Sequence, residues 1–293
     1  MKFLILLIFG FPILAQNPAN TEIFIFDIIK ENQKITIENG ENISQNPGYD
    51  NQPSFYSGDT LLFSKTREIQ TDISGLSFKD SKSFWINDSR VGSEYSPQRI
   101  PGTKDVAAVR LDSIGLQLLY KYDWKTGESS VLVPKLKVGY FAFLNEERLL
   151  AAVLNDTAMD LMLYDLEQNT SKMLVNNVGR SIHKVPGIQS MSYTVVNENK
   201  NIDLYILDLK GEEPKSYFLV ALPIGIQDYA WLDENRILLG SGTKLFLYDI
   251  LGESEWTVIA DLPEYQLQNI TRVAVNPDAT KLALAADLLP IQE

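Results

Sequence analysis

The chain repeats a short strand pattern at an almost constant interval, and this repeat limits its possible folds more than any other feature. In each copy, alternating apolar residues end in an aspartate, as in Leu119–Asp123 and Leu161–Asp165. Further copies end at Asp208 and Asp249, so the four aspartates are spaced 42, 43 and 41 residues apart. Turn-forming residues follow each aspartate and lead into another apolar segment, which is typical of strands joined by tight turns. A regular series of similar β-units is therefore expected.

Each unit is predicted to contain four strands. Two of them precede the strand that ends in aspartate, as Tyr140–Leu144 and Arg148–Val153 do in one copy. Four-stranded antiparallel units at this period are typical of β-propeller blades, whereas a β-sandwich, the alternative fold, has no fixed period. Asp27 and Asp123 lie 96 residues apart, which leaves room for one degenerate copy at Thr71–Leu76. The sequence thus predicts an all-β, six-bladed propeller.

The two ends of the chain are expected to close this ring together. The segments 271–275 and 281–285 supply only two strands before the chain ends. The segments 22–27 and 34–38 supply two more, so N-terminal strands would complete the C-terminal blade and remove its free edge. On this interpretation residues 16–293 form a single propeller domain.

Residues 1–15 have the pattern of a secretory signal peptide. Lys2 precedes the apolar run 3–14, and Ala15 provides a small residue at the expected cleavage site. The alternatives are a membrane anchor or a buried strand, and the anchor is disfavoured because the run is short and contains Pro12. No later segment has the length and apolarity of a transmembrane helix, and no cysteine is present for lipid attachment. We therefore expect an exported protein, periplasmic or secreted, without a transmembrane anchor after cleavage.

Charge and composition exclude several function classes. The formal net charge is −12, whereas binding to nucleic acid requires clustered Lys and Arg. The absence of cysteine excludes disulfides, thiolate nucleophiles and zinc–thiolate sites, and the single histidine, His183, excludes a His-rich metal site. The chain has no phosphate-binding loop and no Gly-x-Ser-x-Gly nucleophile motif. We expect no cofactor, with calcium as the only cation considered.

Two motifs resemble the TolB-like propeller family, whose blades are WD40-like (PD40-type) repeats. One is the segment 46–55, Asn-Pro-Gly-Tyr-Asp-Asn-Gln-Pro-Ser-Phe, and its continuation through 61–64 and 70–73. The other is 276–283, Asn-Pro-Asp-Ala-Thr-Lys-Leu-Ala, which is similar to the family's Ser-Pro-Asp-Gly-Lys turn and has Ala279 where the family usually has glycine. The resemblance covers essentially the whole mature chain. It implies an exported bacterial protein that binds a protein or peptide partner in the cell envelope.

Candidate site residues lie just before or early in the predicted innermost strands, where each blade would present side chains at one mouth of the channel. Charged groups that converge on an enclosed funnel can bind a ligand strongly. The alternative is that the three acids among them pair with the two arginines and the histidine across the channel. The candidates are Tyr49, Asp50, Glu94, Tyr95, Tyr140, Arg180, His183, Asp228, Tyr229 and Arg272.

These features predict a non-catalytic binding or scaffold propeller, monomeric, that engages a protein or peptide through one channel mouth. The alternative function is that of a lactonase-like propeller hydrolase. In that case Asp50, Glu94 and Asp228 would hold a divalent cation such as calcium through their carboxylate oxygens, and His183 would act as the base.

Overall fold

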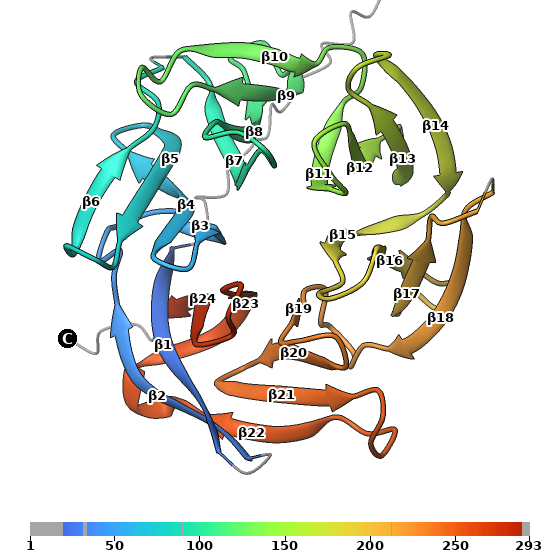
Figure 1. The fold of residues 1–293 in the computed structure, drawn as a ribbon. Coiled ribbons are helices and arrows are strands. Elements are labelled where there is room, and N and C mark those ends of the chain that lie inside the picture. Colours follow the sequence, from blue (N-terminus) through green and yellow to red (C-terminus); the bar gives the residue numbers. More distant parts are fainter. Residues whose placement is uncertain (1–19, 32–33, 90, 212, 289–293) are drawn as a thin grey trace, which may run out of the picture.

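The chain forms six four-stranded antiparallel sheets that stand around a central channel as the blades of a propeller (Figure 1). The architecture is that of a computed structural model, which describes residues 20–31, 34–89, 91–211 and 213–288. The predicted all-β, six-bladed propeller is confirmed. From the channel outward, blade 1 contains β3 (Asn51–Ser57), β4 (Thr60–Arg67), β5 (Gln70–Ser77) and β6 (Lys82–Trp85); blade 2 contains β7 (Ser93–Arg99), β8 (Val106–Leu111), β9 (Gln117–Tyr122) and β10 (Ser129–Val133); and blade 3 contains β11 (Val138–Phe143), β12 (Arg148–Leu154), β13 (Met159–Asp165) and β14 (Thr170–Val175).

The remaining blades follow the same plan. Strand β5 occupies the position expected for the degenerate copy at 71–76. Helical structure in the described residues is limited to the 3-10 turn η1 (Pro263–Tyr265), and nothing there could cross a membrane as a helix. Blade 4 contains β15 (Val178–Lys184), β16 (Ser190–Val196), β17 (Ile202–Asp208) and β18 (Lys215–Ala221); blade 5 contains β19 (Ala230–Trp231), β20 (Arg236–Ser241), β21 (Lys244–Asp249) and β22 (Thr257–Asp261); and blade 6 contains β23 (Leu267–Val275), β24 (Lys281–Leu288), β1 (Thr21–Glu31) and β2 (Lys34–Asn42).

The second strand of each blade contains a run of at least four consecutive buried residues. In β4, Leu61 and Phe63 pack against blade 6, while Leu62 between them packs against blade 2. Successive side chains of a strand point to opposite faces, so a strand that lies between two blades buries both sets. This is why the second strands read as continuous apolar runs, such as Leu149–Ala152 in β12, rather than as alternating patterns.

The repeated aspartate ends the third strand because its carboxylate organises the turn to the fourth. Oδ1 of Asp123 accepts hydrogen bonds from the backbone N–H groups of Lys125 and Thr126 at 2.9 and 2.8 Å. Asp165, Asp208 and Asp249 accept equivalent bonds from backbone N–H groups two or three residues later. A short carboxylate side chain suits this local turn geometry. The periodic signal in the sequence is therefore a series of turn caps.

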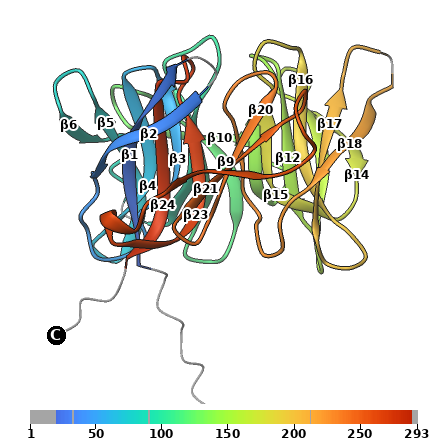
Figure 2. The same cartoon turned by 90° about the horizontal axis from the view of Figure 1, so that it is seen from below.

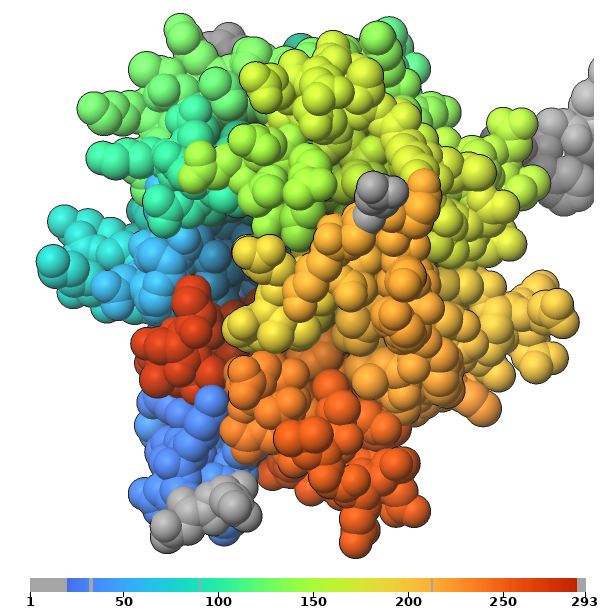
Figure 3. All heavy atoms as spheres, turned by 45° about the vertical axis from the view of Figure 1, so that its right-hand side comes forward, coloured from blue at the N-terminus to red at the C-terminus, as the bar shows by residue number. Residues whose placement is uncertain are grey.

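Ring closure occurs as the sequence predicts. Strand β1 pairs antiparallel with β24, from Thr21 opposite Asp287 to Asp27 opposite Lys281, so blade 6 has the order β2-β1-β24-β23. Figure 3 shows the N-terminal strands beside the C-terminal ones on the surface of the ring. Both closing strands extend beyond the predicted ends at 27 and 38, to Glu31 and Asn42. The predicted signal peptide, residues 1–15, lies outside the described residues.

The turn at 276–281 carries alanine, Ala279, at the position where the similar family turn has glycine. Oδ1 of Asn276 accepts the backbone N–H groups of Thr280 and Lys281, both at 2.8 Å. Ala279 adopts a left-handed conformation with φ of 52°. Glycine reaches this region without steric cost, which explains why the similar family turn carries glycine there.

Loops gather on two opposite faces of the ring (Figure 2). Because strand direction alternates within a blade, one face carries the connections between blades and the turns from second to third strands. We call this the connecting face; the innermost strands begin there. The opposite face carries the turns from first to second and from third to fourth strands.

Candidate functional site

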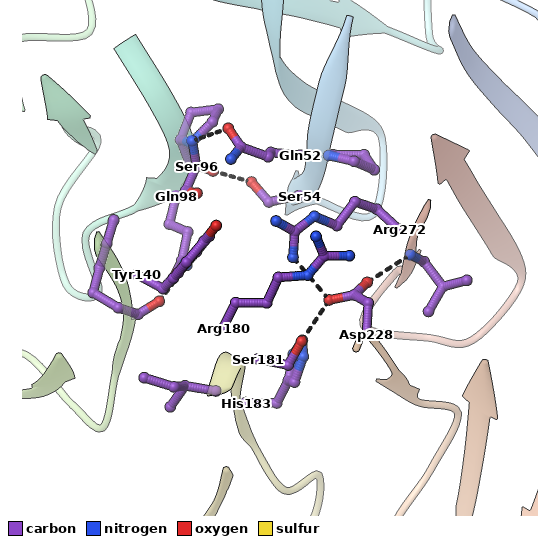
Figure 4. A pocket seen from close by; sticks show the side chains of 15 residues that line it. Gln52, Ser54, Ser96, Gln98, Tyr140, Arg180, Ser181, His183, Asp228 and Arg272 are labelled. Atoms are coloured by element: carbon purple, nitrogen blue, oxygen red, sulfur yellow. Dashed lines mark hydrogen bonds and ion pairs between the residues drawn. The ribbon is translucent and has the colours of Figure 1, made fainter. Parts of the chain in front are cut away.

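The innermost strands and the segments that precede them bring polar side chains to one place in the channel. A cavity of about 80 Å³ lies among them. Figure 4 shows these side chains converging from five blades, with the arginine guanidinium groups next to one another. The labelled residues that line the cavity are Gln52, Ser54, Ser96, Gln98, Tyr140, Arg180, Ser181, His183, Asp228 and Arg272.

Asp228 is the carboxylate of this site, and its oxygens are well satisfied. Oδ1 accepts hydrogen bonds from Ser181 Oγ at 2.6 Å and from Arg272 Nη1 at 3.1 Å, and Oδ2 accepts the backbone N–H of Val273 at 3.0 Å. Burial raises the pKa of Asp228, but the positive charges of Arg272 and its neighbours outweigh burial and hold this pKa below its ordinary value. Asp228 is therefore charged at neutral pH.

Two arginines face this single carboxylate. The Arg272 guanidinium pairs with Asp228 and lies 5.3 Å from the centre of the Tyr140 ring, a cation–π contact. Arg180 donates from Nη2 to the carbonyl of Thr271 at 2.9 Å, while its buried Nε has no hydrogen-bond partner among the described residues. Burial and the charge of Arg272 lower the pKa of Arg180. The positive charge in the channel exceeds the negative charge.

His183 lies further along β15, with its ring edge-on to Tyr229 at a centroid distance of 4.6 Å. Burial lowers the pKa of His183 below 6.5, so the imidazole is neutral at pH 7 and adds no charge. Its buried Nε2 also has no hydrogen-bond partner among the described residues.

Seven of the ten predicted site residues come together in this part of the channel. Tyr49 and Tyr95 contact each other edge to face at 6.0 Å between ring centroids. Burial raises the pKa of Tyr49 to about 12, against the opposing effect of the nearby Arg272 and Arg180 charges. The seven residues are Tyr49, Tyr95, Tyr140, Arg180, His183, Asp228 and Arg272.

The other three predicted residues point into the interior and are corrected here. Tyr229 is fully buried in the core between blades 4 and 5, and its hydroxyl donates to Ser192 at 2.7 Å. Asp50 is fully buried and accepts from the backbone N–H of Thr66 and from Asn46 Nδ2. Donors on neighbouring segments of the fold bind the Tyr229 hydroxyl and Asp50 Oδ1, while Asp50 Oδ2 has no partner among the described residues, and neither side chain lines the channel cavity.

Glu94 is likewise withdrawn, into the space between blades 1 and 2. Its Oε1 accepts from Ser89 Oγ at 2.8 Å and from the Tyr122 hydroxyl at 3.0 Å, with Arg110 Nε at 3.8 Å. Pairing of the acids across the channel is thus limited to Asp228 with Arg272.

The three carboxylates considered as cation ligands occupy separate hydrogen-bond networks, in different inter-blade spaces. Nowhere in the described part of the chain do three or more His, Asp or Glu side chains gather as a metal could require. Asp50, Glu94 and Asp228 therefore do not form the common ligand set on which the hydrolase alternative depends.

The sequence interpretation missed polar residues on the innermost strands themselves. Gln52 and Ser96 occupy matching irregularities in β3 and β7, with φ of 56° and 52°, and Gln52 Oε1 accepts the Ser96 N–H at 2.7 Å. β-Bulges of this kind redirect side chains near binding sites. The sequence did contain a signal for these channel-facing side chains, namely polar residues at alternate positions of the predicted inner strands. These residues are Gln52 with Ser54 and Ser96 with Gln98.

Stability should depend on pH through Glu94. Burial raises the pKa of this carboxyl to about 7, above the 4.5 of an exposed glutamate. Between these values the native state binds more protons than the unfolded state, so stability falls as pH rises through the window. We expect Glu94→Gln to raise the free energy of unfolding by up to about 3 kcal/mol at pH 8 and by little at pH 4.

Urea denaturation of both proteins from pH 4 to pH 8 measures this difference. The same change at exposed Glu128 serves as the control and should leave the curve unchanged. A constant difference between wild type and Glu94→Gln across the range would refute the assignment.

The opposite face carries a wider hollow that the sequence did not indicate. Its volume is about 1100 Å³, and it lies where the innermost strands end. Aromatic residues from three blades contribute to its wall, together with the Pro-Gly turns 101–102 and 186–187. The aromatic residues are Phe55, Tyr56, Phe143 and Trp231.

Fold and site together define the chain as a six-bladed propeller. Its channel has a cationic site where Arg180 and Arg272 lie beside Asp228. Its fold is that of TolB-type propellers. It is similar to a protein assigned as TolB from Agrobacterium tumefaciens, with 13% identity, a TM-score of 0.69, and coverage of 94% of this chain and 100% of that one. TolB from Acinetobacter baumannii gives 9% identity and a TM-score of 0.60, with 94% of this chain and 66% of that chain covered.

A chain of a nidogen–laminin complex is also similar, with 9% identity, a TM-score of 0.60, and coverage of 87% of this chain and 97% of that one. No protein-family model and no curated protein sequence matches the chain. At these identities the likenesses establish the fold alone.

Proposed function

We propose that this protein is a non-catalytic, exported binding propeller that holds a protein or peptide partner of the cell envelope at the mouth on the connecting face. The observation that carries the proposal is the cationic site of Arg180 and Arg272, only partly satisfied by the chain's own groups. Both arginines also line a cavity with residues 225–227, which belong to a connection between blades on that face. If the channel residues only paired with one another, each arginine would have a carboxylate partner. Arg272 pairs with Asp228, whereas Arg180 is bonded to a backbone carbonyl.

The connecting face also carries exposed isoleucines. Ile69 in the β4–β5 turn is 100% exposed, Ile114 in the β8–β9 turn 85%, and Ile224 in the connection from blade 4 to blade 5 89%. Val91 and Leu116 add to this face. Exposed apolar side chains on one face supply the kind of contact that protein interfaces bury.

The resemblance to TolB-like propellers implies interaction rather than catalysis. One propeller of similar fold comes from a nidogen–laminin complex. Export follows from the predicted signal peptide, 1–15, and puts the partner in the envelope. Fold does not determine function, so the proposal depends on the site.

Capture of envelope proteins by matched surface variants tests the proposal. Ile69→Ser/Ile114→Ser/Ile224→Ser removes apolar contacts from the connecting face, and we expect it to reduce capture of the partner at least tenfold, because each buried isoleucine contributes about 1.5–3 kcal/mol. The control, Ile188→Ser/Leu251→Ser, makes the same kind of change on the opposite face. Loss of capture with the control alone would contradict the proposal.

A further inference from the structure

The cationic site has one unit of positive charge without a counterion. Arg272 forms its ion pair with Asp228, which accepts its hydrogen bonds from Ser181, Arg272 and the backbone of Val273 and none from Arg180. Arg180 is held by the carbonyl of Thr271, a neutral group. His183 contributes no charge, so two guanidinium groups face one carboxylate. A buried charge without a partner is unfavourable, and a singly charged anion would balance it.

Two buried nitrogens beside the same cavity have no hydrogen-bond partner in the described structure. They are Nε of Arg180 and Nε2 of His183, which lie on the same strand, β15, three residues apart. Buried polar atoms are nearly always hydrogen-bonded in folded proteins, so unpartnered ones that line a cavity indicate the position of a ligand atom. A guanidinium fork is well suited to a planar oxyanion.

The size of the cavity restricts what this ligand group can be. The space that Arg180 and His183 line together is about 80 Å³, far below the volume of pockets that enclose whole small molecules, and it shares lining residues with larger spaces beside it. It therefore suits one functional group of a larger partner. Asp228 lies against the same wall, and its charge would repel a doubly charged phosphate more strongly than a carboxylate. Size and charge both favour a carboxylate.

We propose that Arg180, together with Arg272 and His183, forms a subsite for one carboxylate group of the partner. This inference rests on the proposed function and specifies the chemistry of its ligand. Arg180 and His183 provide the unpartnered nitrogens, Arg272 adds charge while it remains bound to Asp228, and the apolar residues of the connecting face contact the rest of the partner. The carboxylate can belong to a chain terminus or to an acidic side chain.

Small probes test the subsite without the partner. N-acetyl-alanine presents a terminal carboxylate, and N-acetyl-aspartate amide presents a side-chain carboxylate; N-acetyl-alanine amide is the neutral control. At constant ionic strength, we expect at least one carboxylate probe to bind with a dissociation constant on the order of 1 mM and to shift the backbone amide resonances of Thr271 and Val273. The neutral amide should produce no shift.

Arg180→Gln should weaken binding of the carboxylate probe at least about tenfold, because charge-assisted hydrogen bonds are lost. Arg180→Lys, which keeps the charge but not the fork, should weaken it less. Arg148→Gln, which removes the same charge at the start of β12, is the control and should bind as wild type does. Circular dichroism confirms that each variant is folded.

The outcomes separate the two proposals. Preference for either carboxylate probe supports the subsite and identifies the source of the group. Equal binding by Arg180→Gln, no saturable shift at about 100 mM probe, or tighter binding of inorganic phosphate would overturn it. If probes bind but no partner is captured, the subsite is supported and the proposed protein partner is refuted. If wild type and Arg180→Gln capture a partner equally, the protein partner is supported and the subsite is refuted.

Discussion

A chain from which residues 20–42 are deleted is expected to lose cooperative folding. The deletion removes β1 and β2, and with them the side chains of Ile23, Phe24 and Phe26, which are almost completely buried. Each large apolar truncation costs about 3–5 kcal/mol, so the loss of three such side chains is comparable to the whole of the roughly 5–15 kcal/mol that stabilises a typical domain. It also exposes β24 as a free edge. Thermal unfolding followed by circular dichroism measures the loss.

A circular permutant provides the matched control. Thr21 pairs with Asp287, so a short linker can join the end of β24 to the start of β1. A chain that begins at residue 43 and carries 20–42 after 288 has the same strands in the same blade, in the order that the other blades have. We expect it to unfold cooperatively at nearly the wild-type temperature. A deletion variant as stable as the permutant would contradict closure by β1.

Asp228→Asn is expected to lower the free energy of unfolding by about 3–5 kcal/mol, the cost typical of breaking a buried ion pair by removing one partner. The amide cannot balance Arg272, so both guanidinium groups would remain buried without a counterion. The control is Asp233→Asn, which removes a more exposed pair with Arg236 and should cost less than about 1 kcal/mol. Urea denaturation at pH 7 compares them. Equal losses of unfolding free energy in the two variants would show that the buried charge of Asp228 does not stabilise the arginines of the channel.

The fold was predictable because local chemistry repeats in every blade. Turn-capping aspartates such as Asp123 and Asp208 mark the ends of third strands, and apolar runs such as Leu149–Ala152 mark second strands buried on both faces. Neither signal depends on contacts between distant residues. Closure was predictable from counting, since the incomplete first and last units complement one another.

The site was predictable only in part, because the direction of a side chain near the start of an inner strand depends on its neighbours. Arg180 and Arg272 face the channel as expected. Asp50 and Glu94 turn away because donors such as Thr66 N–H and Tyr122 Oη–H lie within the blades. Positions of donors contributed by other strands cannot be read from the spacing of residues along the chain. The same reason explains why the wide hollow on the opposite face was missed.

The most direct test of the account is crosslinking in the native cell envelope, with a photoreactive residue at position 114 on the connecting face or at position 251 on the opposite face. Both native side chains, Ile114 and Leu251, are largely exposed, so the two sites are matched. The account predicts a discrete protein adduct from position 114 that is strongly reduced by Arg180→Gln, and none of comparable yield from position 251. An adduct from position 251 alone, or one from position 114 that Arg180→Gln leaves unchanged, would contradict binding through the cationic mouth.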